Sequence, residues 1–240
     1  MKIIERIREK QERIGASRQP CIAFLGDSVT QGCFEIYNDR GCVKTTFYPT
    51  EAYAEKVKKI FSMLFPSVPL NVINAGISGD TSWGGLARLE RDVMSYSPDL
   101  VVVCYGLNDA GRGADWIGRY EESLREIFDK VKNAGAEVIF MTPNLRIHDP
   151  DYSCEDKVLE SCRRSISENE RAGWLDRYLG CARDVAKESG VPVCDCNALW
   201  KTMSESGVDT DRLLSNVANH PTRELHWMFA YELVRTMFEK

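Results

Sequence analysis

Five short apolar runs, each rich in β-branched residues, alternate along this chain with longer segments of helical spacing. Their nearly continuous hydrophobicity is typical of strands that are covered on both faces, as in a parallel sheet. The runs are residues 21–25 (CIAFL), 70–74 (LNVIN), 99–105 (DLVVVCY), 136–142 (AEVIFMT) and 191–195 (VPVCD). Strand alternating with helix predicts right-handed crossovers and helices on both faces. We therefore expect an α/β fold of three layers (α/β/α), flavodoxin-like, around a five-stranded parallel sheet.

The segments between these runs place apolar residues three and four positions apart, the spacing of one helix face. Helices are expected over residues 50–65, 84–96, 115–133, 155–189 (with a break near Gly173) and 222–238. Residues 31–49 form the one long stretch that we predict to be irregular. Such a loop after the first strand is a common place for functional residues.

Length and charge limit the kinds of partner that the chain can have. A chain of 240 residues suits one sizeable core, so we expect a single domain over residues 1–240. The net charge of −5 and the absence of a basic run argue against nucleic acid and against acidic membrane surfaces. No apolar run reaches the roughly 20 residues that would cross a bilayer. The oligomeric state is left open.

The cysteines and histidines argue against a metal centre. The nine cysteines are scattered and include no CxxC pair, and the three histidines show neither HxH nor HxxxH spacing. We therefore predict no metal and no cofactor. Free thiols fit a reducing cytoplasm, and the first 15 residues lack the apolar core of a signal peptide. We expect a cytoplasmic protein, although a chain from which a leader had been removed would look the same.

Polar, chemically useful side chains follow the predicted strands directly. In open α/β sheets the active site forms beyond the carboxyl ends of the strands, so we expect these segments to meet there. They are Ser28 after the first strand, residues 74–85 (NAGISGDTSWGG) after the second, 106–110 (GLNDA) after the third, 142–152 (TPNLRIHDPDY) after the fourth, and 219–226 (NHPTRELH) before the last helix.

Four of these segments resemble, in order, the conserved blocks of the SGNH (GDSL) hydrolase family. FLGDSVTQG supplies Ser28, NAGISGDTSWGGLARL supplies Gly79, GLND supplies Asn108 and NHP supplies His220. The resemblance covers the chain from end to end and implies the SGNH hydrolase fold and a GDSL-type esterase or acylhydrolase. It implies that Ser28 is the nucleophile and His220 its base. The backbone N–H groups of Ser28 and Gly79 and the Asn108 amide would then form the oxyanion hole.

These residue types suit acyl transfer. A histidine with an ordinary pKa of about 6.5 can take the proton of a serine hydroxyl, and an oxyanion needs donors that are already in place. Glycine at position 79 allows close approach and a positive φ. Taken singly, each residue has a plainer interpretation: Ser28 as a helix cap, Gly79 and Asn108 as turn residues, His220 as a capping or surface residue. Only the four together favour catalysis.

The match to the family fails at one position. Most members have an aspartate three residues before the histidine, and here that residue is Val217. This matters because the carboxylate fixes the imidazole tautomer and stabilises the imidazolium. A backbone carbonyl or the Asn216 amide oxygen could accept the Nδ1 proton, which is the interpretation that we favour. A longer loop could instead bring Asp211 or another acid to the ring, or the protein could be slow or inert.

The substrate is less constrained than the reaction. Phe34, Tyr37, Phe47 and Tyr48 in residues 31–49 suit an aromatic wall for a sugar ring or a short acyl group, or they pack the loop down. We expect a small acyl ester, preferably an O-acetyl group on a carbohydrate. The alternatives are a thioesterase or lysophospholipase on the same site, and a carbohydrate-binding protein without catalysis. Candidate substrate contacts are Asp27, Phe34, Trp83 and Arg146, whereas His226 is expected to be structural.

Overall fold

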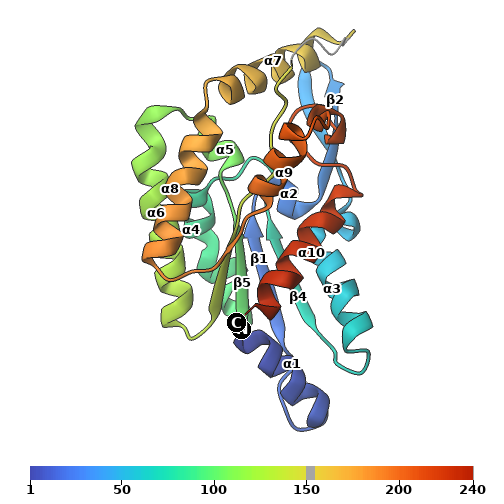
Figure 1. Cartoon of the computed structure of the whole chain (residues 1–240), viewed down its shortest axis with the longest axis vertical. Coiled ribbons are helices and arrows are strands. Elements are labelled where there is room, and N and C mark those ends of the chain that lie inside the picture. The colour runs from blue at the N-terminus through green and yellow to red at the C-terminus, as the bar shows by residue number, and fades with distance from the viewer. Residues whose placement is uncertain (150–154, 240) are drawn as a thin grey trace.

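A computed structural model describes residues 1–149 and 155–239 of the chain. Its centre is a five-stranded parallel sheet in the order β4-β1-β5-β6-β7 (Figure 1). The strands are β1 (Cys21–Gly26), β4 (Asn71–Gly76), β5 (Leu100–Cys104), β6 (Glu137–Met141) and β7 (Val193–Cys194). Along the chain this order is second, first, third, fourth, fifth, which is the flavodoxin-like order. The predicted fold class and all five strands are therefore confirmed.

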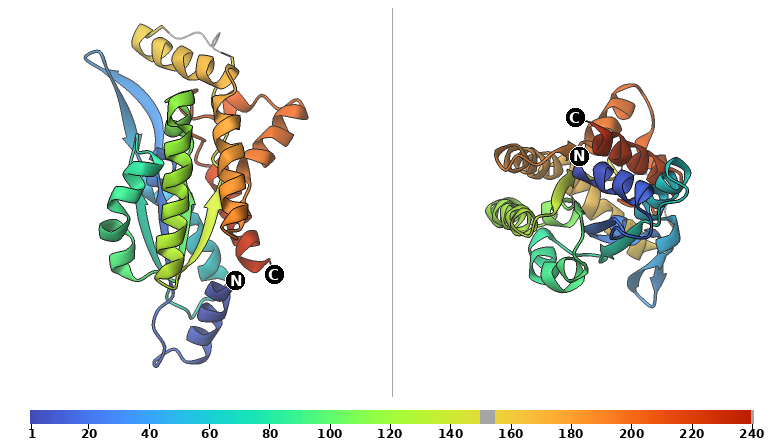
Figure 2. Two further views of the ribbon diagram at one scale, coloured as in Figure 1. Left: turned by 90° about the vertical axis from the view of Figure 1, so that its left-hand side faces the viewer. Right: turned by 90° about the horizontal axis from the view of Figure 1, so that it is seen from below.

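Helices cover both faces of the sheet (Figures 1 and 2). α4, α6 and α8 pack together on one face, and α3 and α10 pack together on the other, where α1 joins them. The α-helices are α1 (Lys2–Glu12), α2 (Ser28–Gln31), α3 (Tyr53–Leu64), α4 (Ser82–Asp92), α5 (Leu107–Ala110), α6 (Ile117–Asn133), α7 (Lys157–Arg171), α8 (Trp174–Glu188), α9 (Cys196–Glu205) and α10 (Leu225–Phe238). Short 3₁₀ turns are η1 (Pro49–Glu51), η2 (Met94–Tyr96), η3 (Ala114–Trp116) and η4 (Thr210–Leu213). The predicted break near Gly173 is confirmed, since this residue has a φ of +74° and separates α7 from α8.

The segment predicted to be irregular, residues 31–49, is instead an antiparallel hairpin of β2 (Cys33–Asp39) and β3 (Cys42–Phe47). Its two turn residues, Arg40 and Gly41, both have positive φ values, 53° and 86°. A two-residue turn of this kind normally contains Asn-Gly or Asp-Gly, and Arg-Gly carries no such signal. The hairpin and α7 stand beyond the carboxyl ends of the strands (Figure 1).

One buried arginine joins the carboxyl ends of three neighbouring strands. Arg88 in α4 donates to the carbonyl of Ala75 at the end of β4 (2.6 Å) and to that of Gly26 at the end of β1 (3.0 Å). It also donates to the Tyr105 hydroxyl, directly after β5, at 3.0 Å. The Asp80 carboxylate balances its charge at 2.8 Å. The loops that leave these three strands therefore share one anchor.

Two adjacent glycines allow α4 to lie close enough for this anchor. A Cβ atom at Gly84 would come within 1.9 Å of Asp80 Oδ1, and one at Gly85 within 2.2 Å of the Tyr105 hydroxyl oxygen. Both distances are far below van der Waals contact, so a side chain at either position would displace Asp80 or Tyr105, both partners of Arg88, or push α4 away from the strand ends. The Gly84-Gly85 pair is thus a packing requirement of the fold.

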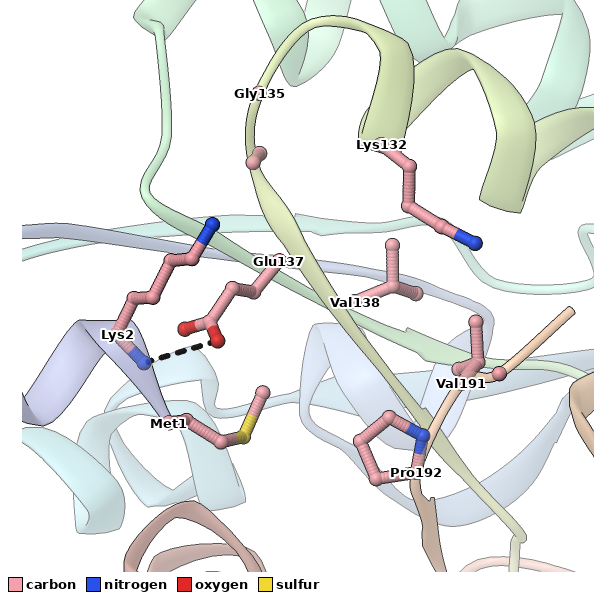
Figure 3. A pocket seen from close by; sticks show the side chains of 10 residues that line it. Met1, Lys2, Lys132, Gly135, Glu137, Val138, Val191 and Pro192 are labelled. Atoms are coloured by element: carbon pink, nitrogen blue, oxygen red, sulfur yellow. Dashed lines mark hydrogen bonds between the residues drawn. The ribbon is translucent and has the colours of Figure 1, made fainter.

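A pocket lies at the amino ends of β6 and β7 (Figure 3). There the Glu137 carboxylate accepts hydrogen bonds from the backbone N–H groups of Lys2 (2.9 Å) and Ile3 (2.8 Å), which docks α1 on the sheet. This pocket lies at the end of the sheet opposite the polar motifs. Its position gives it no part in their chemistry.

Three further findings concern the described residues. Their eight cysteines are all free thiols, and Cys154 lies outside them, as do the last three residues of the segment 142–152. Within residues 1–149 and 155–239, no helix has the length and apolar character needed to span a membrane. The same part of the chain contains no cluster of three His, Cys, Asp or Glu side chains suited to a metal ion.

We predict that Arg88→Met destabilises the fold by roughly 3–5 kcal/mol, because it leaves the Asp80 carboxylate and buried carbonyls without their partner. Urea unfolding followed by circular dichroism measures this loss. Arg91→Met is the matched control, since the Arg91 side chain is 74% exposed and pairs only with Asp92. That control should stay within about 0.5 kcal/mol of the wild type. Equal effects of the two substitutions would contradict the anchoring role.

Candidate active site

Ser28 lies at the sharp turn between β1 and α2. β1 ends at Gly26, and the carboxylate of Asp27 caps α2 by accepting the Val29 backbone N–H at 3.0 Å. Ser28 is the first residue of this short helix, which ends at Gly32 with a φ of +92°. Strand, cap and helix together hold the serine at the carboxyl edge of the sheet.

His220 and Ser28 are in direct contact although 192 positions separate them. The distance between His220 Nε2 and Ser28 Oγ is 3.0 Å. The other ring nitrogen, Nδ1, lies 2.9 Å from the backbone carbonyl oxygen of Phe34. Because a carbonyl oxygen can only accept, the ring carries its proton on Nδ1 and Nε2 keeps a free lone pair. This tautomer can accept the proton of the serine hydroxyl.

Burial keeps the His220 ring neutral. Loss of solvent lowers the pKa of His220 to about 4, although the hydrogen bond to the Phe34 carbonyl and the charge of Glu35 act in the opposite direction. Almost all of the imidazole is therefore in the neutral form, with a proton on Nδ1 alone, at neutral pH. The ring is ready to act as a base over a wide pH range, but it is a weaker base than an exposed histidine.

The prediction that Asn216 orients the His220 ring is wrong. The ring is oriented by a backbone carbonyl, which was the other acceptor expected. Asn216 Oδ1 instead accepts backbone N–H groups of Ala218 (3.0 Å), Asn219 (2.9 Å) and His220 (2.9 Å). Three bonds to one oxygen close the loop into a tight turn. Val217, at the position of the usual aspartate, has a φ of +49°, an unusual conformation for a β-branched residue. Asn216 therefore shapes the loop that presents the histidine.

Asp211 is also not the missing acid. Its carboxylate accepts the backbone N–H groups of His148 (3.0 Å) and Asp149 (2.9 Å) and so fixes the segment after β6. The His148 side chain is exposed. The acceptor for His220 is a main-chain oxygen, and a main-chain oxygen leaves no mark in a sequence. This is why no motif could reveal it.

Gly79 and Asn108 lie on neighbouring loops that the structure ties together. Asn108 Nδ2 donates to the carbonyl of Asp80, the residue after Gly79, at 2.9 Å. Ser78, the residue before Gly79, donates its backbone N–H to the Gln31 side chain in α2 at 2.7 Å. Gly79 has a φ of +78°, which favours glycine as expected. These bonds hold both predicted donors against the helix that begins with Ser28.

Asp109 stabilises the turn of the third block, residues 106–109. Its two carboxylate oxygens accept the backbone N–H groups of Ser82 (2.8 Å) and Gly106 (3.1 Å), which joins α4 to the turn before Asn108. Burial raises the pKa of Asp109 to about 6. The two bonds favour the charged form and keep the carboxylate in place.

A polar pocket opens beside Asn108 and the loop of His220, and α7 forms its outer wall. Its lining residues are Leu107, Asn108, Gly111, Arg146, Ser165, Ile166, Asn169 and Asn219. Arg146, predicted as a substrate contact, belongs to this lining, but its guanidinium is buried and already bonded. It donates to Glu170 (2.8 Å), to Asn169 Oδ1 (2.7 Å) and to the Leu107 carbonyl. Its first role is to join α7 to the Asn108 loop.

Two other residues predicted as substrate contacts have enclosed side chains with structural partners. The Phe34 ring is fully buried, and it packs against Tyr48 and His226. Asp27 is buried as a helix cap, and the loss of solvent raises its pKa to about 7. The predicted aromatic wall is therefore absent at Phe34, whose backbone rather than ring reaches the site.

Trp83 remains a predicted contact. It stacks on Trp116 with ring centroids 5.2 Å apart, and the guanidinium of Arg119 lies 5.0 Å from its ring. The other aromatic residues of the proposed wall, Tyr37 and Phe47 on the hairpin and Tyr48 directly after it, are about half exposed.

His226 is structural in this fold, as expected. It is fully buried, and its Nδ1 accepts the backbone N–H of Tyr53 at 3.0 Å. Burial lowers its pKa to about 3, so the ring stays neutral. Its ring packs against that of Phe34, with the two centroids 5.0 Å apart.

Comparisons with known proteins identify the family to which the chain belongs. Residues 24–228 match the GDSL-like Lipase/Acylhydrolase family. An acetylxylan esterase of Geobacillus stearothermophilus is 26% identical over 230 residues, which are 87% of this chain and 91% of that protein. Thioesterase 1/protease 1/lysophospholipase L1 of Escherichia coli (strain K12) is 45% identical, but over only 30% of this chain and 34% of that protein.

The fold has a counterpart among solved structures. The lipase/acylhydrolase from Enterococcus faecalis superimposes with a TM-score of 0.67 at 24% identity, over 91% of this chain and 95% of the other. The family match covers most of the chain, including the segments that carry Ser28, Gly79, Asn108 and His220. The chain therefore belongs to the GDSL-like lipase/acylhydrolase family of carboxylic ester hydrolases.

Proposed function

We propose that this chain hydrolyses small acyl esters, acetyl esters above all, through a serine-bound acyl intermediate, and that its preferred substrates are acetylated carbohydrates. One observation carries the proposal. Ser28 Oγ lies 3.0 Å from the nitrogen of His220 that keeps its lone pair, and the opposite nitrogen is held by a carbonyl. This is the geometry of a nucleophile and its base.

The reaction has two steps. Ser28 Oγ attacks the ester carbonyl carbon while His220 Nε2 takes the hydroxyl proton, and the carbonyl oxygen becomes an oxyanion. The backbone N–H groups of Ser28 and Gly79 and the Asn108 amide donate to that oxygen. His220 then gives its proton to the departing alcohol, which leaves an acyl-serine. In the second step His220 takes a proton from water, the water oxygen attacks the acyl-serine, and the acid leaves as the serine regains its proton.

The carbonyl of Phe34 stabilises the imidazolium less than a carboxylate would, but it holds the ring in the orientation that the reaction needs. In serine proteases, replacing the aspartate by asparagine costs roughly 10⁴ in kcat, because it produces the wrong imidazole tautomer. The Phe34 oxygen can only accept, so it enforces the correct tautomer. What it lacks is a full negative charge opposite the imidazolium.

The lining of the pocket beside Asn108 favours an ester substrate whose alcohol part is polar. Ser165 and Asn169 from α7 face the same space as Asn108 and Asn219, and Leu107 and Ile166 are its aliphatic members. Side-chain amides and hydroxyls suit the hydroxyl groups of a sugar, whereas a long acyl chain needs a continuous apolar groove. One relative that matches along most of the chain is named an acetylxylan esterase. Thioesterase or lysophospholipase activity is the less favoured alternative, and a binding protein without catalysis would have no need of the Ser28–His220 contact.

The proposal predicts that Ser28→Ala and His220→Ala each lower kcat for p-nitrophenyl acetate by about 10⁴-fold or more. A fluorophosphonate probe should label the wild type at Ser28 and leave Ser28→Ala unlabelled. Ser95→Ala, at an exposed serine in η2, is the matched control and should keep both activity and labelling. An unlabelled wild type, or an active Ser28→Ala, would overturn the mechanism.

The pocket makes a separate prediction about the substrate. Ser165→Leu should lower kcat/KM for acetylated xylo-oligosaccharides by about 10-fold, the value of one hydrogen bond of about 1.4 kcal/mol. The same variant should hydrolyse p-nitrophenyl acetate within about twofold of the wild type, because this small ester does not need the pocket.

Ser161→Leu is the control for this prediction, since Ser161 is exposed one turn earlier on α7 and does not line the pocket. It should resemble the wild type on both substrates. If Ser165→Leu affects both substrates equally, or if the wild type prefers the p-nitrophenyl palmitate ester to the acetate, the carbohydrate proposal is wrong.

A further inference from the structure

The loop that carries His220 touches the strand that carries Phe34 at a second point. Arg223, three residues after the histidine, donates through two nitrogens to the carboxylate of Glu35, the residue after Phe34. The two distances are 2.5 Å (Nη1 to Oε1) and 3.1 Å (Nη2 to Oε2). Two contacts therefore join the same two segments. One is between the His220 ring and the Phe34 carbonyl, and the other is between the Arg223 guanidinium and the Glu35 carboxylate.

The strand is irregular at this place. The pairing of β2 with β3 shifts in register between Cys33 and Ile36, so Phe34 and Glu35 lie within the irregular part. Such bulges re-aim main-chain and side-chain groups and recur beside active sites. Here the Thr46 hydroxyl bridges the gap: it accepts the Glu35 backbone N–H (3.1 Å) and donates to Glu35 Oε2 (2.6 Å). Phe34, whose carbonyl meets His220 Nδ1, thus lies within the irregular pairing.

Arg223 also packs on the residue whose carbonyl is used. Its guanidinium carbon lies 4.4 Å from the centroid of the Phe34 ring and 4.6 Å from that of Tyr48. A planar guanidinium that is bidentate to a carboxylate and stacked on aromatic faces is more restrained than an ordinary surface pair. Each of these contacts limits the movement of Phe34 relative to the loop of His220.

We propose that Glu35 and Arg223 are positioning residues for His220, and that they replace together the aspartate that is missing at position 217. Arg223 holds the His220 loop on the strand so that the Phe34 carbonyl meets Nδ1. Glu35 anchors Arg223 and brings a carboxylate charge to the neighbourhood of the imidazolium. The inference rests on the proposed function, because it assigns these residues to the base of that reaction.

The charged and titratable groups around His220 come from three places. Glu35 lies on β2, Arg223 and His226 follow His220 in the chain, and Asp27 precedes Ser28. The bond from Arg223 lowers the pKa of Glu35 to about 2, so this carboxylate is charged at every pH of interest. His226 stays neutral because burial lowers its pKa to about 3. Asp27 titrates at about 7, well above the pKa of His220, and so does not affect the sign of the shifts at low pH.

The proposal predicts a kcat loss of about 10-fold in both Glu35→Gln and Arg223→Gln, with KM for p-nitrophenyl acetate unchanged. Their pH profiles should move in opposite directions. Loss of the negative charge makes the imidazolium less stable, so the acid limb of kcat/KM moves to lower pH in Glu35→Gln. Loss of the positive charge moves the same limb to higher pH in Arg223→Gln. A merely structural pair would not produce opposite shifts.

A double variant and two further substitutions complete the test. Glu35→Gln with Arg223→Gln should lose about 10-fold, as each single variant does, and not about 100-fold, because one contact is removed in all three. Thr46→Val keeps both charges but removes the bridge across the bulge, so kcat should fall without a shift of the acid limb. Glu126→Gln is the matched control: this carboxylate on α6 pairs with Lys130, both side chains are about half exposed, and the change should leave kcat and the acid limb unchanged.

The outcomes separate this inference from the proposed function. If Ser28→Ala abolishes activity while Glu35→Gln and Arg223→Gln keep the wild-type kcat and acid limb, the positioning role is wrong and the mechanism stands. Losses confined to KM, or equal losses in Glu126→Gln, would also overturn it. If either charge variant fails to fold, judged by its circular dichroism melting curve, Thr46→Val decides: an unchanged kcat there refutes the role.

Discussion

The buried guanidinium of Arg88 is the interaction on which the arrangement of this site depends. A parallel sheet aligns its strands but does not fix the loops that leave their carboxyl ends. Arg88 joins the last residues of β4 and β1 to Tyr105 after β5, and Asp80 neutralises it within the second block. The loops that carry Ser28, Gly79 and Asn108 leave from these three strand ends. Their relative positions follow from one side chain that must satisfy all of its partners at once.

Much of the fold could be predicted from the sequence, because the spacing of apolar residues indicates the strands and helices, and glycines indicate where they end. The five strands, the break at Gly173 and the meeting of Ser28 with His220 follow from apolar runs, a glycine and a family motif. The hairpin could not be predicted, since its Arg40-Gly41 turn lacks the usual residues. The acceptor for His220 could not be predicted either. Every residue has a carbonyl, and nothing in the sequence distinguishes that of Phe34.

Replacing a carboxylate by a carbonyl changes what the base can do. The carbonyl secures the tautomer, which is the larger part of the task, but it stabilises the imidazolium only as a dipole. With burial this gives a ring that stays neutral down to a pH of about 4. Under the proposed mechanism, such a base would be available in acid, where an ordinary histidine is charged, and would be weaker at neutral pH.

The hairpin connects the base to the cover of the site. Its first strand provides the Phe34 carbonyl at one end, and near its other end Asn38 donates to Asp156, the cap of α7, at 3.3 Å. α7 in turn supplies Ser165 and Asn169 to the polar pocket. One strand therefore contacts both the imidazole, through the Phe34 carbonyl, and the helix that lines the pocket, through Asn38. Under the proposed function, a substrate that displaced α7 would also disturb β2 and the acceptor that orients His220.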